Sequence, residues 1–446
     1  MARKEPIRAV KGMRDILPPE SALWEFVEEF GARTVFKSYG YQEIRTPLVE
    51  PTELFARGVG TDTDIVTKEM YTWEDRDKTS LTLRPEATAS VIRAYIEHRF
   101  DQRPGVKKFY YMGPMFRRER PQKGRYRQFY QIGAEAIGSE SPAVDAEVIE
   151  MLVEMLGRLR ISGYTLLLNS VGCKECRPRY IAQLRGELKK VRSQLCEDCQ
   201  RRSETNPLRV LDCKVPADQS IIDRLPTIMD SLCEVCRTHF EQLQGYLGDR
   251  RIIFTIHPRM VRGLDYYTRT TFEFVHGSLG AQNSLLGGGR YDGLSEDLGG
   301  PPAPGIGFSI GEDRLVLTMQ ETKNDLSEVA WFLSHTPPVY IAWMGEAAYV
   351  RAASLAREFR GQGHSIEVAA DDTKLKKSLE IASKLDMKYV LIIGERELEA
   401  NRYPLRNMTS GEQWAVTAEE LAYLYGHRTM KFVKGTATAE DMKEKT

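Results

Sequence analysis

Two strand-like segments joined by a strongly basic loop constrain the fold of this chain most. Residues 108–116 (KFYYMGPMF) and 128–137 (QFYQIGAEAI) are rich in aromatic and branched side chains, as β-strands are. The loop between them, residues 117–127 (RRERPQKGRYR), holds six cations, one carboxylate, a proline and a glycine. Together these segments predict a long antiparallel hairpin with a basic tip.

The polar residues of the second strand predict that this hairpin floors a pocket. Arg127, Gln131 and Glu135 share one face, because alternate residues of a strand point to the same side. A strand that faces only packed core should not bury Gln and Glu on one side. The loop favours a phosphate ligand, since the whole protein has a formal net charge of zero. A solvated charged turn is the alternative for the loop.

The length of 446 residues is too great for one ordinary core and predicts two or three domains. Hydrophobic residues make up 41% and charged residues 28%, which is typical of a soluble globular protein. No stretch approaches the roughly 20 apolar residues of a membrane span, and residues 1–15 lack an apolar signal core. We therefore expect a cytoplasmic protein with no membrane partner.

Changes of pattern along the chain predict its organisation. Residues 20–37 indicate an amphipathic helix, and residues 41–49 indicate a strand ending near Pro47. Charged helices fill about 171–250, and strand-like, glycine-rich sequence returns over 251–315. Beyond a proline-marked linker at 327–338, strands and helices alternate, which predicts a small parallel α/β domain. The predicted fold class is α+β, with a first domain over 1–335 that carries the helical insertion, an α/β domain over 336–430 and a charged tail over 431–446.

Seven cysteines fall in or near the predicted insertion. Six form Cys-x-x-Cys pairs, and Cys213 stands apart from them; the pairs are Cys173/Cys176, Cys196/Cys199 and Cys233/Cys236. Paired spacing suits a metal, but a helix between the first two pairs would hold them roughly 27 Å apart. Those two pairs therefore do not share an ion, whereas a returning chain could bring the third pair to either end. A structural zinc ion is one interpretation. From the sequence we favour the other interpretation, in which the cysteines are reduced thiols of a helical subdomain and form no metal site.

Four further segments combine residue types suited to a charged or planar ligand. They are residues 83–88 (LRPEAT), 262–267 (RGLDYY), 287–292 (GGGRYD) and 304–314 (PGIGFSIGEDR). Glycine lets backbone approach a ligand closely, and alternate glycines on a strand leave room for a flat ring. The last segment is not a Walker loop, because it lacks Gly-Lys-Ser/Thr. Taken singly, these segments are equally consistent with surface turns and a tyrosine-rich core edge.

Taken together, the segments resemble the class II aminoacyl-tRNA synthetases, and within that class the histidyl-tRNA synthetase family, over nearly the whole chain. Residues 41–55, 116–119 (FRRE) and 305–314 resemble the three motifs of the class, the first of which implies a homodimer interface. Residues 262–267 and 288–293 (GGRYDG) resemble the two histidine-specific motifs, and residues 11–18 (KGMRDILP) the family's opening. The resemblance implies an antiparallel-sheet catalytic domain with a helical insertion, followed by an α/β anticodon-binding domain.

The resemblance also implies an activity and a role for each matching residue. The chain would activate L-histidine with ATP and Mg²⁺ to histidyl-adenylate and transfer histidine to the 3′ end of tRNA(His). The implied catalytic residues are Arg262 and Arg117, on two sides of the α-phosphate. Histidine would be bound by Glu86, Thr88, Arg117, Gln131, Glu135, Arg262, Tyr266 and Tyr267, with Glu135 and the two tyrosines reading the imidazole. ATP would be bound by Arg117, Glu119 and Arg314, and tRNA by Arg120, Gln122, Lys123 and Arg125.

Two other functions fit parts of the sequence. A non-catalytic, histidine-sensing regulatory subunit of ATP phosphoribosyltransferase shares the core fold and a histidine pocket. It resembles the synthetases less in the phosphate arginines and lacks a C-terminal domain, whereas this chain keeps Arg117, Arg262 and Arg314. A tRNA-binding protein without chemistry would not need the Arg262 motif or the glycine-punctuated strand.

Overall fold

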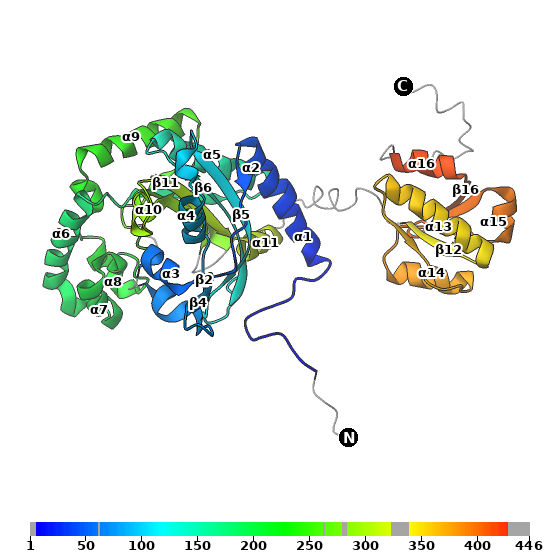
Figure 1. The fold of residues 1–446 in the computed structure, drawn as a ribbon, viewed down its shortest axis with the longest axis horizontal. Coiled ribbons are helices and arrows are strands. Elements are labelled where there is room, and N and C mark those ends of the chain that lie inside the picture. Colours follow the sequence, from blue (N-terminus) through cyan, green and yellow to red (C-terminus); the bar gives the residue numbers. More distant parts are fainter. Residues whose placement is uncertain (1–5, 61–62, 262–263, 279–282, 323–338, 427–446) are drawn as a thin grey trace, which may run out of the picture. The chain divides into compact units, whose positions relative to one another are not determined.

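The computed structural model of the protein describes residues 6–60, 63–261, 264–278, 283–322 and 339–426. The chain divides into two compact units, Met1–Leu326 and Ser327–Thr446, which we describe separately (Figure 1). The expected domain boundary at 335/336, the linker and the charged tail lie outside the described residues.

An eight-stranded sheet forms the centre of the first unit, in the order β1-β5-β6-β11-β10-β9-β7-β8. The inner pairs are antiparallel, and the two outermost pairs, β1 with β5 and β7 with β8, are parallel. The strands are β1 (Gln42–Glu43), β5 (Lys107–Phe116), β6 (Gln128–Ile137), β7 (Tyr164–Ser170), β8 (Thr255–Ile256), β9 (Thr268–His276), β10 (Ser284–Arg290) and β11 (Gly305–Gly311). A separate sheet contains β2 (Val49–Pro51), β3 (Tyr71–Glu74) and β4 (Ser80–Leu83).

The predicted basic hairpin is confirmed. Strands β5 and β6 pair antiparallel from Phe116 with Gln128 to Lys107 with Ile137. On its other side β6 pairs with β11. The pocket-forming strand therefore lies inside the sheet, flanked by two of the motif segments.

Different helices cover the two faces of this sheet. On one face, Phe36 of α2 (Thr34–Ser38) stacks on Tyr110 of β5 at 4.8 Å between ring centroids. Helix α5 (Pro142–Arg158), which Ser141 caps at its N-terminus, contacts β11. On the other face, α4 (Thr88–Glu97) packs its apolar side against Phe109 and Tyr111. The remaining helices of this part are α1 (Glu20–Phe26), α3 (Thr52–Val59), α10 (Leu294–Asp297) and α11 (Glu312–Glu321), with single-turn or π-helical stretches η1 (Val27–Arg33), η2 (Ile65–Glu69) and η3 (Phe100–Gln102).

The predicted helix over residues 20–37 is confirmed, as the run α1, η1 and α2. The strand predicted over 41–49 is wrong in extent, because only Gln42–Glu43 and Val49–Pro51 are strands. Pro47 lies in the gap, where its missing N–H takes no part in a ladder.

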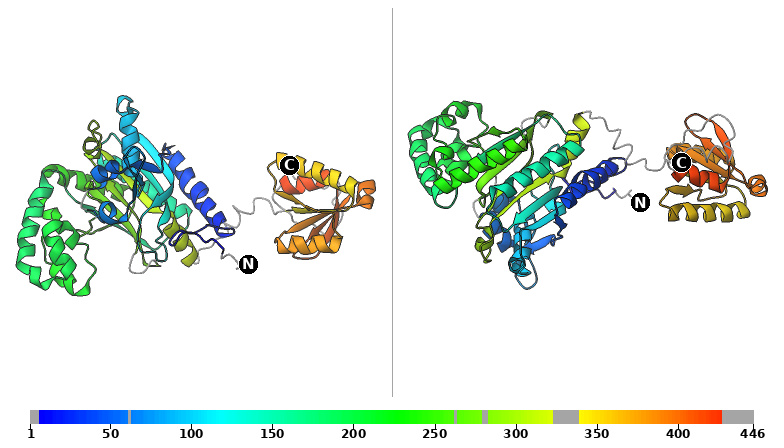
Figure 2. Two further views of the ribbon diagram at one scale, coloured as in Figure 1. Left: turned by 60° about the horizontal axis from the view of Figure 1, so that its bottom comes forward. Right: turned by 90° about the horizontal axis from the view of Figure 1, so that it is seen from above.

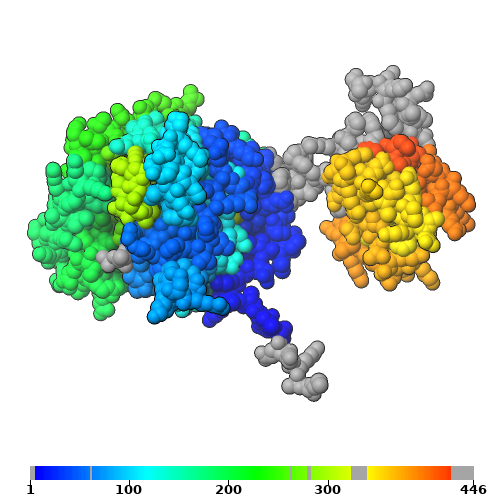
Figure 3. All heavy atoms as spheres, viewed as in Figure 1, coloured from blue at the N-terminus to red at the C-terminus, as the bar shows by residue number. Residues whose placement is uncertain are grey.

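A helical subdomain fills the chain between β7 and β8, and Figure 3 shows it in green along one side of the unit. Its helices are α6 (Cys176–Val191), α7 (Glu197–Thr205), α8 (Pro216–Ile222) and α9 (Glu234–Asp249), with short turns η4 (Arg192–Gln194), η5 (Pro207–Val210) and η6 (Ile228–Ser231). Tyr180, Leu184 and Leu188 line the buried face of α6, at the helical spacing read from sequence. Strand-like sequence was expected from residue 251 onward, but the first strand there is only Thr255–Ile256.

The second unit is a five-stranded sheet in the order β13-β12-β14-β15-β16, with helices on both faces (Figure 2). The predicted alternation is present as β12 (Val339–Trp343), α13 (Glu346–Gly361), β13 (Ile366–Val368), α14 (Leu375–Lys384) and β14 (Tyr389–Ile393). The parallel pairing predicted for these three strands is confirmed, whereas β15 and β16, which the sequence did not predict, add antiparallel to β14. The later elements are α15 (Glu395–Ala400), β15 (Tyr403–Asn407), β16 (Gln413–Val416) and α16 (Ala418–Gly426).

Within the described ranges, every helix is too short or too polar to cross a lipid bilayer.

A fully buried arginine links three segments of the first unit. Arg290, at the end of β10, donates to the carboxylate of Asp145 in α5 at 2.5 Å and to the carbonyl oxygen of Ser139. It also pairs with Asp292 at 3.1 Å. The arginine of the GGRYD segment therefore holds the fold together, and removing it would leave the carboxylate of Asp145 buried without its cation.

We expect Arg290→Met to lower the free energy of unfolding of the first unit by about 3–5 kcal/mol, because one partner of a buried charge pair is lost. Urea denaturation followed by circular dichroism measures the change. Arg45→Ala is the matched control, since Arg45 pairs with Glu43 at the surface with 79% of its side chain exposed. This control should shift stability by no more than about 0.5 kcal/mol, and equal effects of the two changes would contradict the role of Arg290.

Candidate active site

A cavity of about 290 Å³ opens on the sheet face that carries the polar residues of β6. Its lining comes from the hairpin, from β10 and β11 and from the start of α11: among others Arg117, Glu119, Arg125, Phe129, Gln131, Tyr267, Gly287, Ser309 and Arg314. The predicted pocket on the hairpin therefore exists, and the glycine-rich strands form part of its wall.

Glycines allow the strands below this cavity to approach one another. A Cβ atom added at Gly307 would collide with the carboxylate of Glu135, its partner on β6. A Cβ atom at Gly288 would collide with the carbonyl oxygen of Gly307. The space that a side chain at residue 307 would fill is thus reserved for the Glu135 carboxylate.

Glu135 is the most deeply buried acidic group of the site, with no exposed side-chain surface. The hydroxyl of Thr88 donates to one carboxylate oxygen at 2.8 Å. The other oxygen has no hydrogen-bond partner among the residues that the structure describes. Burial raises the pKa of Glu135 to about 8, although the Thr88 hydrogen bond acts in the opposite direction. A buried oxygen without a partner is uncommon in folded proteins, which makes Glu135 a candidate for binding a polar group of a ligand.

Glu86 and Thr88 come together at the start of α4. Both oxygens of the Glu86 carboxylate accept main-chain N–H groups, from Thr88 at 2.7 Å and from Ala89 at 3.0 Å. The carboxylate thus caps the helix while its remaining lone pairs stay available. Burial raises the pKa of Glu86, and the two N–H donors lower it. Since Thr88 also contacts Glu135, these three predicted residues form one hydrogen-bonded group.

Tyrosines surround this group. Tyr266 and Tyr267 are nearly buried, with ring centroids 4.9 Å apart. Two further tyrosines, Tyr111 and Tyr291, have buried hydroxyls with no hydrogen-bond partner in the described ranges. Burial, followed by the charge of Glu135, raises the pKa of both well above its usual range. Sequence analysis did not assign Tyr111 or Tyr291 to the site. Both could have been identified from the sequence. Tyr291 lies in the GGRYD segment, and Tyr111 lies opposite Gly133 of β6, on the same sheet face as Gln131 and Glu135.

Arg117 lines the cavity and is the first residue after β5. Its Nε donates to the carbonyl oxygen of Pro85 at 2.9 Å, and its guanidinium stands 5.3 Å from the ring centre of Phe129. Burial lowers the pKa of Arg117, while the nearby carboxylates of Glu69 and Glu86 act in the opposite direction. Gln131, which faces the same cavity, has a side-chain oxygen without a partner in the described part of the chain.

The cavity wall is strongly cationic, because Arg117, Arg125 and Arg314 all line it. Arg314 donates from Nη1 to the carbonyl oxygen of Ser284 at 2.8 Å, which fixes its guanidinium at the cavity wall. Arg125 forms an ion pair with Glu119, and Arg117 lies 3.9 Å from the same carboxylate. Burial and the neighbouring charges of Arg125 and Arg117 lower the pKa of Arg314. The carboxylate of Glu273 acts in the opposite direction and offsets only part of this effect. This concentration of guanidinium groups suits a ligand with several phosphates.

The residues predicted to contact tRNA separate into two sets. Arg120, Gln122 and Lys123 are exposed on the hairpin loop, and Lys123 pairs with Glu321 at 2.6 Å. Arg125 instead lines the cavity with Arg117 and Arg314. The remaining predicted residue, Arg262, lies outside the described residues.

The pKa of Glu135 makes stability depend on pH in a defined direction. The folded protein keeps this proton up to about pH 8, whereas an ordinary glutamate loses it near 4.5. Between these values the folded state binds more protons than the unfolded state, so stability falls as pH rises. Glu135→Gln should remove a slope approaching about 1.4 kcal/mol per pH unit, measured as urea denaturation of the ligand-free protein from pH 5 to pH 8. Exposed Glu74→Gln is the control, and parallel curves for wild type and Glu135→Gln would contradict the assignment.

Comparison with known proteins gives a consistent result across the chain. A sequence model of the histidyl-tRNA synthetase family matches residues 12–315, and one of the anticodon-binding domain matches residues 338–424. A histidine–tRNA ligase of Solibacter usitatus is 63% identical over 93% of this chain and 98% of its own length, and one of Koribacter versatilis is 53% identical over 95% and 97%. The crystal structure of apo histidyl-tRNA synthetase from S. aureus aligns with a TM-score of 0.78 and 36% identity, covering 94% of this chain and all of that chain. The pocket, the motifs and these matches together place the chain in the histidyl-tRNA synthetase family, among the class II aminoacyl-tRNA synthetases.

Proposed function

We propose that the cavity holds L-histidine at its closed end and ATP at its open end. The single observation that carries this assignment is that Gln131, which lines the cavity together with several arginines, lies on the same face of β6 as the buried Glu135 carboxyl group, one oxygen of which has no partner among the described residues. An imidazole has two ring nitrogens that need polar partners, and a nucleotide has phosphates that need cations.

In the first half of the reaction, the histidine carboxylate attacks the α-phosphate of ATP and pyrophosphate leaves. Two anions must approach one another, and negative charge grows on the phosphoryl oxygens. We assign the stabilisation of this charge to Arg117 and Arg262, and the binding of the outer phosphates to Arg314. ATP enters as its magnesium complex, whose ion keeps phosphate and water ligands. Glu119 orients the adenine end, and its ion pair with Arg125 supports its position.

Histidine is selected by the buried polar group around Glu135. One proton is shared between the Glu135 carboxyl and the imidazole, whose ordinary pKa lies near 6.5, and Tyr266 and Tyr267 complete the recognition of the ring. Glu86, Thr88 and Gln131 hold the α-amino and carboxylate end of histidine. An amino acid without matching ring nitrogens would leave these buried groups unpaired, which costs about 1–3 kcal/mol for each lost hydrogen bond.

In the second half of the reaction, the terminal adenosine of tRNA(His) accepts the histidyl group. The exposed loop residues Arg120, Gln122 and Lys123 bind the acceptor stem, with Arg125 at its inner edge. The second unit supplies the anticodon contacts, since residues 338–424 match the anticodon-binding domain. We assign this activity to the cytoplasm, where tRNA is charged.

A homodimer is the assembly that we propose. The segment that resembles the first class II motif, residues 41–55, leaves Leu48 and Val49 exposed at 42% and 39%. Trp73, on β3 of the same small sheet, is 40% exposed. Apolar side chains gathered on one exposed sheet are suited to a subunit interface.

The regulatory-subunit function is not better supported. A structure described as an ATP phosphoribosyltransferase regulatory subunit/histidyl-tRNA synthetase from Bacillus halodurans C aligns with a TM-score of 0.60 at 22% identity, which concerns the fold alone. Histidine-dependent exchange of pyrophosphate into ATP separates the two functions, because a sensor binds histidine without exchange. Exchange should be specific for histidine among the standard amino acids, and its absence would overturn the proposed function.

We expect Arg117→Ala to slow histidine-dependent pyrophosphate exchange by about 100-fold, in line with loss of one preorganised donor to a growing charge. Arg118→Ala is the matched control, since Arg118 is the next residue and its side chain is exposed beside Tyr71. Exchange without tRNA should stay within about threefold of wild type in this control. Near-normal exchange in Arg117→Ala would remove Arg117 from the catalytic assignment.

A chain ending at Leu326, the limit of the first compact unit, should still exchange pyrophosphate but charge tRNA(His) poorly. The reason is that the cavity residues all precede this limit, whereas the anticodon-binding match begins at residue 338. Both activities are measured on the same truncated protein, with its dimeric state checked by light scattering. Parallel loss of both activities in a folded dimer would show that the second unit is needed for the chemistry itself.

A further inference from the structure

We propose that Cys173, Cys176, Cys233 and Cys236 bind one structural zinc ion that joins the two ends of the helical insertion. Sequence analysis favoured reduced thiols with no metal site. The structure confirms that the first two pairs lie apart and shows which of them the third pair joins. The first and third pairs lie together, and Cys213 joins the second pair, beside Asp218, in a separate cluster.

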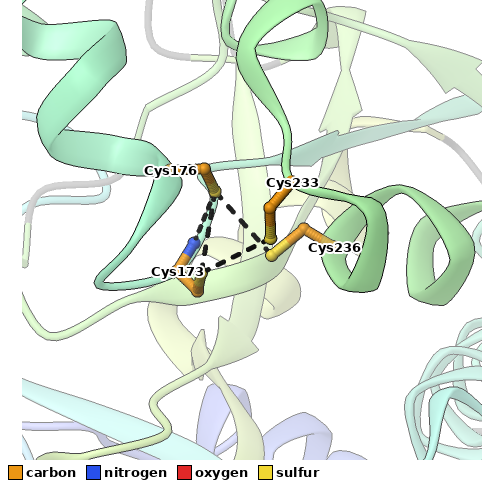
Figure 4. Close-up of side chains that lie close together, drawn as sticks. All are labelled: Cys173, Cys176, Cys233 and Cys236. Atoms are coloured by element: carbon orange, nitrogen blue, oxygen red, sulfur yellow. Dashed lines mark hydrogen bonds between the residues drawn. The ribbon is translucent and has the colours of Figure 1, made fainter.

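The spacing of the four sulfur atoms fits a tetrahedral ion. The Sγ–Sγ distance is 3.7 Å between Cys173 and Cys176, 3.8 Å between Cys173 and Cys233, and 3.8 Å between Cys176 and Cys236 (Figure 4). A tetrahedron with zinc–sulfur bonds of about 2.3 Å has sulfur–sulfur edges of about 3.8 Å. A disulfide needs about 2.05 Å between its sulfur atoms, so the distances match shared coordination of a metal.

The main chain around the first pair is arranged to stabilise thiolates. The N–H of Cys173 donates to the sulfur of Cys176 at 3.2 Å, and the N–H of Glu175 donates to the sulfur of Cys173 at 3.4 Å. Cys176 opens α6, and Cys233 directly precedes α9, so both pairs lie at helix N-termini, where negative charge is favoured. Such donors to the ligands are what a bound zinc ion requires around it.

Burial and ligand type point to a structural ion. Cys176 and Cys236 are each 1% exposed, and four cysteines fill all four positions of a tetrahedral ion. No position then remains for water or substrate, which excludes a hydrolytic role for the ion. Among common metals, four thiolates in tetrahedral array select zinc or iron, and we assign zinc.

The location of the cluster explains what the ion would hold in place. It joins the first turn of α6 to the first turn of α9, which are the entry and exit helices of the insertion. Arg177, the residue after Cys176, donates to the carbonyl oxygen of Val171 at 3.0 Å and to that of Tyr267, which lines the cavity. The ion therefore fixes the helical turn from which Arg177 supports the wall of the pocket.

The second cluster provides an internal comparison. Cys196 and Cys213 are 4.0 Å apart at sulfur, and Asp218 accepts hydrogen bonds from the N–H of Cys196 at 3.1 and 3.2 Å and from the thiol of Cys213 at 3.4 Å. The carboxylate accepts these hydrogen bonds, and we assign an ion to the first cluster alone, where four sulfur atoms stand at tetrahedral spacing.

Metal analysis of the full-length protein tests the assignment. Protein purified after expression with added zinc should contain zinc, and Cys173→Ser/Cys233→Ser should contain one equivalent per chain less than wild type. Cys196→Ser/Cys199→Ser is the matched control and should keep that equivalent. Zinc content unchanged by the first double substitution, or lost only in the control, would overturn the proposal.

Cobalt substitution keeps the test independent of how well the variants fold. Wild-type protein loaded with Co²⁺ should show thiolate-to-cobalt charge transfer and the absorption of a tetrahedral ion, and the control variant should show the same spectrum. An octahedral spectrum, iron in place of zinc in the purified protein, or a Cys173–Cys176 disulfide found by mass spectrometry in freshly prepared protein would each contradict the proposal.

Discussion

A carboxylate without access to water, in the middle of the central sheet, is the constraint on which the first unit depends. Burying Glu135 is costly unless neighbouring groups compensate it. The neighbours are drawn from elements far apart in sequence: Thr88 from the start of α4, Gly307 from β11 and tyrosines from β5 and from the segment after β10. Each element must be correctly placed for the carboxylate to be tolerated. The same arrangement leaves one oxygen of Glu135 without a partner among the described residues, so under the proposed function stability and specificity depend on one group.

The sequence predicted those elements whose signal is local. The β5–β6 hairpin and the alternation from β12 to β14 carry regular patterns of apolar residues, and both are present as expected. Strand β15 was missed because Pro404 is unusual in a strand, and its pairing with β14 covers only Leu405–Asn407. The break between β1 and β2 was missed because the aromatic and branched residues continue across Pro47.

The sequence pointed to many residues of the candidate site, but it did not indicate how deeply they are buried or what packs around them. The two-residue repeat of a strand placed Gln131 and Glu135 on one face. The resemblance to family motifs pointed to Glu86, Thr88 and the arginines. Pairing across the sheet cannot be read from one strand, so sequence did not indicate that Gly307 makes room for Glu135 or that Tyr111 and Tyr291 surround it. Arg290 shows the opposite difficulty, since its motif suggested a ligand contact and its side chain holds Asp145. The sequence separated the first two cysteine pairs correctly but did not indicate which of them the third pair joins, because that depends on the path of the chain between α6 and α9.

The position of β6 has a consequence for how the chain is made. Its partner β5 precedes it directly, but its other partner, β11, leaves the ribosome only after the whole helical insertion and strands β7 to β10. During synthesis the hairpin therefore exists with one edge open, and a sheet that closes through such distant pairing folds slowly and is prone to aggregation. The insertion has its own apolar core and both of its cysteine clusters before β9 begins. The insertion can therefore fold before β11 is available to pair with β6. A nascent chain stalled before residue 305 should contain a folded helical insertion and an incomplete central sheet.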